Sequence, residues 1–240
     1  AFGLSAKDST HFADVLAKAS SNANTNVSLM GETFKYVAPV AGALGFSAED
    51  CATAIGLMAN SGIKASQAGT SLRSIITRMA KPTKDVQSAM TALRVSLTKS
   101  DGSMKSLNEI MVDLRKGFSN LTADQKAQMA ATLGGQEAMS GLLAIVNSSD
   151  KDFNDLTNSI ANCKDAAKDM ADTMNDNLSG QITILKSGLE GLAISLYEEM
   201  ETPLKGVVKQ VQKMVQELQD AFNNGGLDAL VDKTGEVMAE

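Results

Sequence analysis

The sequence predicts an all-α protein, in which a compact multi-helix bundle is followed by a long amphipathic helix with a kink or break at Pro203. Three observations favour this fold class. Strong helix formers such as Ala, Leu, Met, Lys and Gln dominate long stretches of the chain. Proline occurs only 3 times in 240 residues, so few helices are interrupted. Apolar residues recur at helical spacing almost throughout, whereas the alternation typical of strands is almost absent.

Composition limits the functions that this chain can have. Hydrophobic residues make up 43% of it, enough for a sizeable core and too many for a disordered chain. The formal net charge of −6 offers no basic surface, so sequence-specific nucleic-acid binding is not expected. The longest uncharged runs have 13 residues, fewer than the about 20 that a membrane-spanning helix needs. The chain begins at Ala1 without a leader pattern, and we expect it to be an excerpt of a longer protein.

The first part of the chain predicts five consecutive helices: Ala6–Ser20, Val27–Leu44, Ala48–Ser61, Gln67–Ala80 and Lys84–Arg94. The first helix has an apolar face formed by Phe12, Val15, Leu16 and Ala19. Pro39 lies inside the second helix, where it predicts a kink or a broken turn. Gly45 ends that helix, and Ser47 to Asp50 resembles a capping box with Asp in place of Glu. Pro82 ends the fourth helix.

The stretch SGIKASQAGTSLRS, residues 61–74, contains two glycines and could be read as a phosphate-binding loop. A Walker loop has its glycines five positions apart, then Lys and Ser/Thr, and follows a buried strand. Here Gly62 and Gly69 are seven apart, Thr70 stands where the lysine should be, and a helical pattern precedes them. We therefore interpret Gly62 as a helix C-cap and Ser66 as the N-cap of the next helix.

The pattern changes at residues 95–106, where VSLTKSDGSMKS has Asp101-Gly102 at its centre and predicts a small hairpin. A calcium site at Asp101 is a weak alternative, because no EF-hand spacing surrounds it. Three more helices follow, Ser106–Leu121, Thr122–Leu133 and Gln136–Asn147. The first has a stripe of Leu107, Ile110, Met111, Leu114 and Phe118. Gly134-Gly135 predicts a sharp turn, with an anion site at the following helix start as the alternative.

One long amphipathic pattern occupies the last third, from Asp150. Its sixteen apolar positions span 55 residues in 15 steps, a period of about 3.67 that predicts a nearly straight seam. They are Ala167, Ala171, Met174, Leu178, Ile182, Leu185, Leu189, Leu192, Leu196, Met200, Leu204, Val207, Val211, Val215, Leu218 and Phe222. Thr202 and Pro203 predict either one kinked helix or two helices nearly in line. Asn223–Gly226 ends the pattern, and a short final helix follows. The predicted domains are therefore residues 1–149 and 150–240.

No catalytic, cofactor-binding or metal-binding residue is predicted. The single histidine, His11, lies beside Thr10 and Asp14, and nothing marks a nucleophile for it. Two acidic clusters, Asp150/Asp152/Asp155 and Glu198/Glu199/Glu201, fit a helix start and a solvated stripe better than a metal site or an acid–base pair. Cys51 and Cys163, and the methionines 58, 79, 90, 111, 129 and 139, are interpreted as core.

Three stretches resemble the minor-tail core of phage tail tape measure proteins, and together they cover most of residues 12–147. Ala13–Thr83 is ADVLAKASSNANTNVSLMGETFKYVAPVAGALGFSAEDCATAIGLMANSGIKASQAGTSLRSIITRMAKPT. Val95–Met111 is VSLTKSDGSMKSLNEIM, and Leu133–Asn147 is LGGQEAMSGLLAIVN. The long segment around Pro203 also resembles, less specifically, the region that follows this core.

The resemblance implies a protein of the tail lumen that sets tail length during assembly and leaves before or with the DNA. It implies tail tube, assembly chaperone and tail tip or baseplate proteins as partners, self-association in the tail, and assembly in the host cytoplasm. It implies no catalytic residues and no cofactor. Two other classes are weighed against it. A membrane-active helical effector is disfavoured by the acidic balance and short apolar runs, and a wall-degrading enzyme by the single histidine and the missing metal ligands.

Overall fold

The structure is a computed structural model that describes residues 2, 8–176, 178–199 and 204–237. The described residues form α-helices, one short 3₁₀ turn and a single antiparallel bridge, so the all-α prediction is confirmed. The helices are α1 (Ser9–Asn22), α2 (Val27–Ala43), α3 (Ala48–Asn60), α4 (Ala65–Ala80), α5 (Lys84–Leu93), α6 (Leu107–Phe118), α7 (Ala123–Gly134), η2 (Gln136–Ala138), α8 (Met139–Val146), α9 (Asp150–Ala161), α10 (Ala166–Asn175), α11 (Leu178–Glu199) and α12 (Leu204–Val237).

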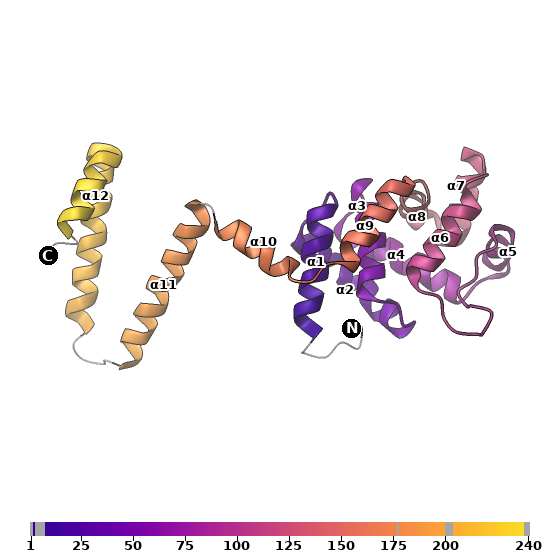
Figure 1. Cartoon of the computed structure of the whole chain (residues 1–240), viewed down its shortest axis with the longest axis horizontal. Helices are drawn as coiled ribbons and strands as arrows, with labels where there is room; N and C mark the ends of the chain where they lie inside the picture. Colours follow the sequence, from indigo (N-terminus) through magenta and orange to yellow (C-terminus); the bar gives the residue numbers. More distant parts are fainter. Residues whose placement is uncertain (1, 3–7, 177, 200–203, 238–240) are drawn as a thin grey trace. The chain divides into compact units, whose positions relative to one another are not determined.

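The chain forms two compact units, residues 1–173 and 174–240. The first unit extends beyond residue 149, the predicted boundary, because α9 belongs to it. Helix α9 packs on α3 and α1 and buries Phe153, Leu156 and Ile160 (Figure 1). Its amphipathic pattern resembles that of the helices that follow it, so the pattern could not show that α9 packs on the first unit.

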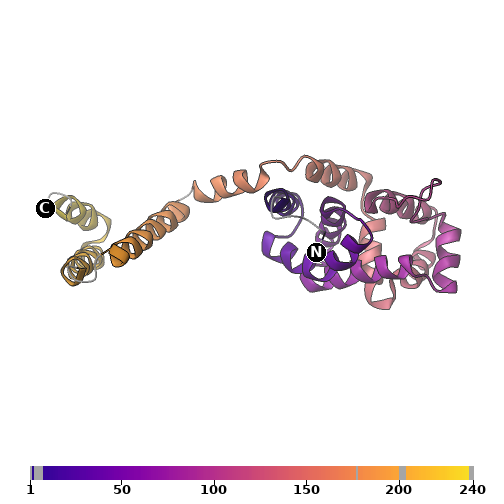
Figure 2. The ribbon, with the colours of Figure 1, turned by 90° about the horizontal axis from the view of Figure 1, so that it is seen from below.

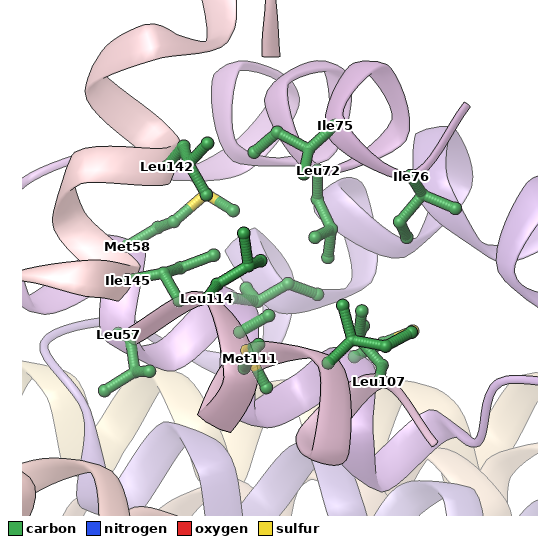
Figure 3. Close-up of a cluster of buried hydrophobic side chains, with 14 of the residues drawn as sticks. Leu57, Met58, Leu72, Ile75, Ile76, Leu107, Met111, Leu114, Leu142 and Ile145 are labelled. Carbon is green, nitrogen blue, oxygen red and sulfur yellow. The ribbon is translucent and has the colours of Figure 1, made fainter. Parts of the chain in front are cut away.

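The core of the first unit is a single cluster of apolar side chains from α1 to α9. Helix α6 contributes the predicted stripe, and all five of its members are at most 2% exposed. Figure 3 shows how part of this stripe meets side chains from α3, α4 and α8. Four of the six methionines interpreted as core are buried, and Met129 and Met139 pack against the cluster while partly exposed, which confirms the interpretation.

Helices α2 and α4 form the most extensive helix pair of this unit. They approach closely at Gly69, where an added Cβ would lie 2.6 Å from the carbonyl oxygen of Thr33. Gly69 therefore serves helix packing. Helix α2 runs without interruption through Pro39, so no turn is broken there. Pro39, which has no N–H to donate to the carbonyl of Lys35, is exposed, and so is Lys35.

The turn between α3 and α4 confirms one of the two predicted caps. Gly62 has a φ of +86°, and the backbone N–H groups of Gly62 and Ile63 bond to the carbonyls of Ala59 and Met58, a Schellman motif. The Ser66 cap is wrong, because α4 begins at Ala65, two residues before the predicted start at Gln67, and its N-cap position is Lys64. The Thr33 hydroxyl donates to the Ala65 carbonyl at 2.9 Å, so a tertiary contact fixes this helix start.

The predicted hairpin is present as a single antiparallel bridge. Thr98 and Met104 make one antiparallel bridge, Gly102 has a φ of +85°, and Asp101 accepts hydrogen bonds from the Ser103 N–H and hydroxyl. These contacts use the Asp101 carboxylate within the turn. Ser106 then begins α6 with a complete capping box closed by Glu109.

The predicted long segment is divided into separate helices. Helices α9 and α10 are separated by residues 162–165, and α11 and α12 by residues 200–203. Pro203 and its predicted kink lie outside the described residues. Within α12, Gly226 has non-helical angles, φ +67° and ψ −152°, where the sequence predicts the last helix to be separated. The residues after it fold back (Figure 2). Lys233 Nζ lies 3.5 Å from Glu217 Oε2.

Candidate functional site

The most unusual surface of the second unit is a row of apolar side chains on α11. Ile182, Leu185, Leu189 and Leu192 follow one another in steps of three and four residues, so they share one face of the helix. Their exposed fractions are 58, 63, 55 and 56%. We call these four residues the α11 stripe. The helix has 22 residues and is therefore about 33 Å long at about 1.5 Å per residue.

Helix α12 carries a second row on one face, Val208, Val211, Val215 and Phe222, at steps of three, four and seven residues, which we call the α12 stripe. These side chains are 45 to 49% exposed. Where α12 folds back after Gly226, Val215, Leu218, Phe222 and Leu230 line a groove of about 630 Å³. The fold-back thus covers only the C-terminal end of this stripe.

The two stripes revise the predicted seam. The α11 stripe keeps alternating steps of three and four residues, which is the spacing of helices that pack along their length. The average of about 3.67 arises because the sixteen positions are separated by ten steps of four residues and five steps of three. Neither stripe is buried by the described part of the chain. Salt bridges on these helices, such as Lys186–Glu190 and Lys213–Glu217, join exposed residues one turn apart and leave the stripes uncharged.

One cleft of the compact unit, about 720 Å³ in volume, lies between α3, α4, α8 and α9. Asp152 is the one ionisable side chain among its lining residues, so no acid–base pair or activated nucleophile is present there. In the described part of the chain, no three His, Cys, Asp or Glu residues are grouped to hold a metal ion.

His11 pairs with the carboxylate of Glu49. Its Nε2 lies 2.5 Å from Glu49 Oε1, joining α1 to the first turn of α3. Burial raises the pKa of the Glu49 carboxyl, but hydrogen bonds from His11 and the backbone outweigh burial and hold it below 4.5. The pair therefore stabilises the packing of two helices.

The acidic residues at the start of α9 each make a separate structural contact. Asp150 accepts from Arg115 Nη2 at 2.7 Å, and Lys151 pairs with Asp155. Asp152 donates its backbone N–H to Ser149, which caps the helix. Of the other cluster, Glu201 lies outside the described residues, and Glu198 and Glu199 lie in the last turn of α11.

Both cysteines are buried and unpaired, as the sequence indicated. Burial raises the pKa of both thiols. At the Gly134-Gly135 turn, Gly135 has a φ of +85° and the turn is sharp. Two donors near it bind protein carbonyls, Ser74 Oγ that of Gly134 and Arg78 Nη2 that of Thr132, whereas the buried Arg78 Nε has no hydrogen-bond partner among the described residues.

Sequence reasoning missed two buried carboxylates that serve distant helix ends. Asp14, in α1, accepts from the backbone N–H groups of Asp165 and Ala167 at the start of α10. Asp50, in α3, is stabilised in its charged form by the backbone N–H groups of Asn108 and Leu107 at the start of α6, although burial raises its pKa overall. The Ser47 side chain accepts the Asp50 N–H, which is one half of the predicted capping box, and the Asp50 side chain does not supply the other half. The sequence feature that could have indicated both roles is an acidic residue on an otherwise apolar face of a helix.

None of the described helices is both long enough and apolar enough to cross a bilayer. The exposed apolar stripes are the candidate functional surface of this chain, a surface for packing against other helices or proteins.

Comparisons with known proteins agree on one family. A model described as phage-related minor tail protein matches residues 1–135. The tape measure protein of Pneumococcus phage Dp-1 is 40% identical over 216 residues, 90% of this chain and 19% of that protein. The probable tape measure protein of Escherichia phage P2 is 27% identical over 221 residues, 91% of this chain and 27% of that protein. The chain thus spans about a fifth to a quarter of these relatives. No solved structure matches it.

Proposed function

Because the chain belongs to the family of phage-related minor tail proteins, we propose that it acts in a tape measure, scaffolding the tail tube and setting its length. The observation that carries this proposal is the 40% identity to the Dp-1 tape measure protein, which extends over 90% of the chain. That span cannot be contained in the first unit alone, so it includes α11 or α12 residues. Membership of a tail protein family also means a virion location and association with other tail proteins.

The finer parts of the proposal concern where the chain lies and what it contacts. We propose that it lies in the tail lumen and is assembled there in the host cytoplasm. Its partners would be the tail tube protein, the assembly chaperones and the tail tip or baseplate proteins. The uncharged α11 and α12 stripes support such contacts and self-association, since about half of each side chain is open to a partner. We propose a structural role without catalysis and release with the DNA on infection.

Deletions along α11 in the phage that encodes this chain test the ruler function. Removing residues 187–197 takes out 11 residues, or three turns, and keeps the apolar positions in phase. If the helix lies along the tube, each such block shortens it by about 16 Å. Because one block is shorter than a tail ring is expected to be, several blocks must be removed or duplicated together. Tail lengths in electron micrographs should then fall or rise in proportion.

The matched control replaces the same 11 residues with an unrelated helical sequence of equal length. A ruler depends on length, so these tails should keep their normal length. Normal tails after several deletions would reject the ruler role of this segment. A complete absence of tails after deletion and after replacement alike would point instead to a role in starting assembly.

A further inference from the structure

The buried carboxylate of Asp14 lies at the start of a helix more than a hundred residues away in sequence. Asp14 is 6% exposed. Its Oδ2 accepts from the Asp165 N–H at 3.1 Å, and its Oδ1 accepts from the Ala167 N–H at 2.9 Å. The first N–H groups of a helix have no partner within it, and a side chain just before the helix usually supplies the acceptor. Here α1 supplies it to α10.

Few other features hold α10 on the compact unit. None of its ten residues is buried, whereas α9 buries Phe153, Leu156 and Ile160. Asp165 has a φ of +64°, a left-handed conformation that residues other than glycine seldom adopt. The chain is therefore bent at Asp165 and held in that conformation by the carboxylate of Asp14.

We propose that Asp14 is a latch on the start of α10. When its two hydrogen bonds break, the chain from Cys163 onward leaves the compact unit while α1 to α9 stay folded. Opening also relieves the bend at Asp165. This inference goes beyond the proposed tape measure role, because it concerns how the helices after residue 163 are released from the first unit.

The Cys163 thiol reports on the latch. Cys163 is 2% exposed, and its carbonyl accepts from the Ala166 N–H at 2.9 Å, so opening the start of α10 must uncover it. Cys51, in α3, is 0% exposed and lies in the core, so it reacts only when the compact unit unfolds. The two cysteines therefore distinguish local opening from global unfolding in one experiment.

The test measures the rate at which N-ethylmaleimide modifies each cysteine, resolved by mass spectrometry. In Asp14→Ala, Cys163 should react about tenfold faster or more, with Cys51 at its wild-type rate, because both N–H groups lose a charged acceptor. Asp14→Asn should show a smaller increase, since its amide retains one acceptor oxygen. Asp165→Asn is the matched control: it removes an equal charge at an exposed position and should stay within about twofold of wild type.

Hydrogen exchange is the second readout, because losing the Asp14 charge also lowers the pKa of the Cys163 thiol and so speeds modification by itself. The amides of residues 163–169 should exchange faster in Asp14→Asn while those of α9 do not change. If Asp14→Ala does not fold, the hydrogen exchange of Asp14→Asn tests the latch in its place. Unchanged exchange at residues 163–169, or exposure of Cys163 only together with Cys51, would overturn the latch.

Discussion

The backbone of Gly69 in α4 lies against the backbone of Thr33 in α2, so close that an added Cβ would sit 2.6 Å from the Thr33 carbonyl oxygen and 2.9 Å from the Tyr36 Cβ. Real Cβ contacts are essentially never shorter than 3.0 Å. The obstacle on the Thr33 side is backbone, which cannot swing away as a flexible side chain can. The missing side chain of Gly69 thus sets the distance of the most extensive helix pair in the compact unit.

Gly69→Ala should therefore destabilise the compact unit by about 1–3 kcal/mol, the usual cost of overpacking a core. Urea unfolding followed by circular dichroism measures the change. Gly31→Ala is the matched control in α2, where an added Cβ meets nothing within 4 Å. That variant should be neutral or more stable by up to about 1 kcal/mol, since Ala favours helix over Gly. Equal stability of the two variants would contradict the close-approach explanation.

Arg115 joins α6 to the α8–α9 connection, and its loss should be costly. Nη1 donates to the carbonyls of Ile145 and Ser148 at 3.1 and 2.7 Å, and the guanidinium lies 4.9 Å from the Phe153 ring centroid. Its side chain is only 11% exposed. Arg115→Met keeps most of the packing but leaves these acceptors without a donor, so we expect a loss of about 2–3 kcal/mol.

The neighbouring Lys116→Met is the control for Arg115. It also removes one positive charge from α6, but at an exposed position. Its free energy of unfolding should change by less than about 0.5 kcal/mol. The Arg115 network would be refuted as a stabilising feature if chemical unfolding gave the two variants the same midpoint.

The sequence predicts the local features of this fold and misses the long-range ones. The α6 stripe from Leu107 to Phe118 and the Gly62 cap follow from spacing and from backbone conformation, which a short window contains. The Ser66 cap failed because the Thr33 hydroxyl, from another helix, fixes the start of α4. The roles of Asp14 and Asp50 were not predicted for the same reason, because their hydrogen-bond partners lie at distant helix ends.

The sequence predicts where the candidate surface lies in the chain but not whether its side chains are buried or exposed. The apolar spacing of residues 167–222 identified it, but the same spacing is typical of a helix packed on the core, such as α9. Only the tertiary structure distinguishes Leu156, which is 3% exposed, from Leu189, which is 55% exposed. The interruption at Gly226 was nevertheless predicted, because two adjacent glycines end the pattern before the last helix.

The His11–Glu49 pair should make stability depend on pH in the acid range. The pKa of Glu49 is lowered in the folded protein, so its ionised form stabilises the fold above pH 4.5 and this contribution is lost as the pH falls below it. Glu49→Gln should therefore be slightly less stable than wild type at pH 7. Because the pair is partly exposed, the difference should not exceed about 1 kcal/mol. The two proteins should converge in thermal melts as the pH falls toward 3.

Glu137→Gln provides the comparison for this titration, since Glu137 is an exposed acid of η2. Its stability difference from wild type should be small and constant across the same pH range. A Glu49→Gln curve that runs parallel to wild type from pH 7 to 3 would mean that the pair does not contribute to stability.

The α11 stripe should control self-association. In Leu189→Glu/Leu192→Glu both changes fall on side chains more than half exposed, so the protomer should keep its helix content and melting temperature. A charge buried in an apolar helix interface costs several kcal/mol, so association should be lost and the sedimenting mass should fall toward 25.1 kDa. Ile184→Glu/Ile194→Glu is the control, because these residues are 49% and 61% exposed on the side of α11 away from the stripe. This control should still associate. Wild-type protein that sediments at 25.1 kDa at every concentration, or equal loss of association in both double variants, would show that the stripe does not join copies of this chain.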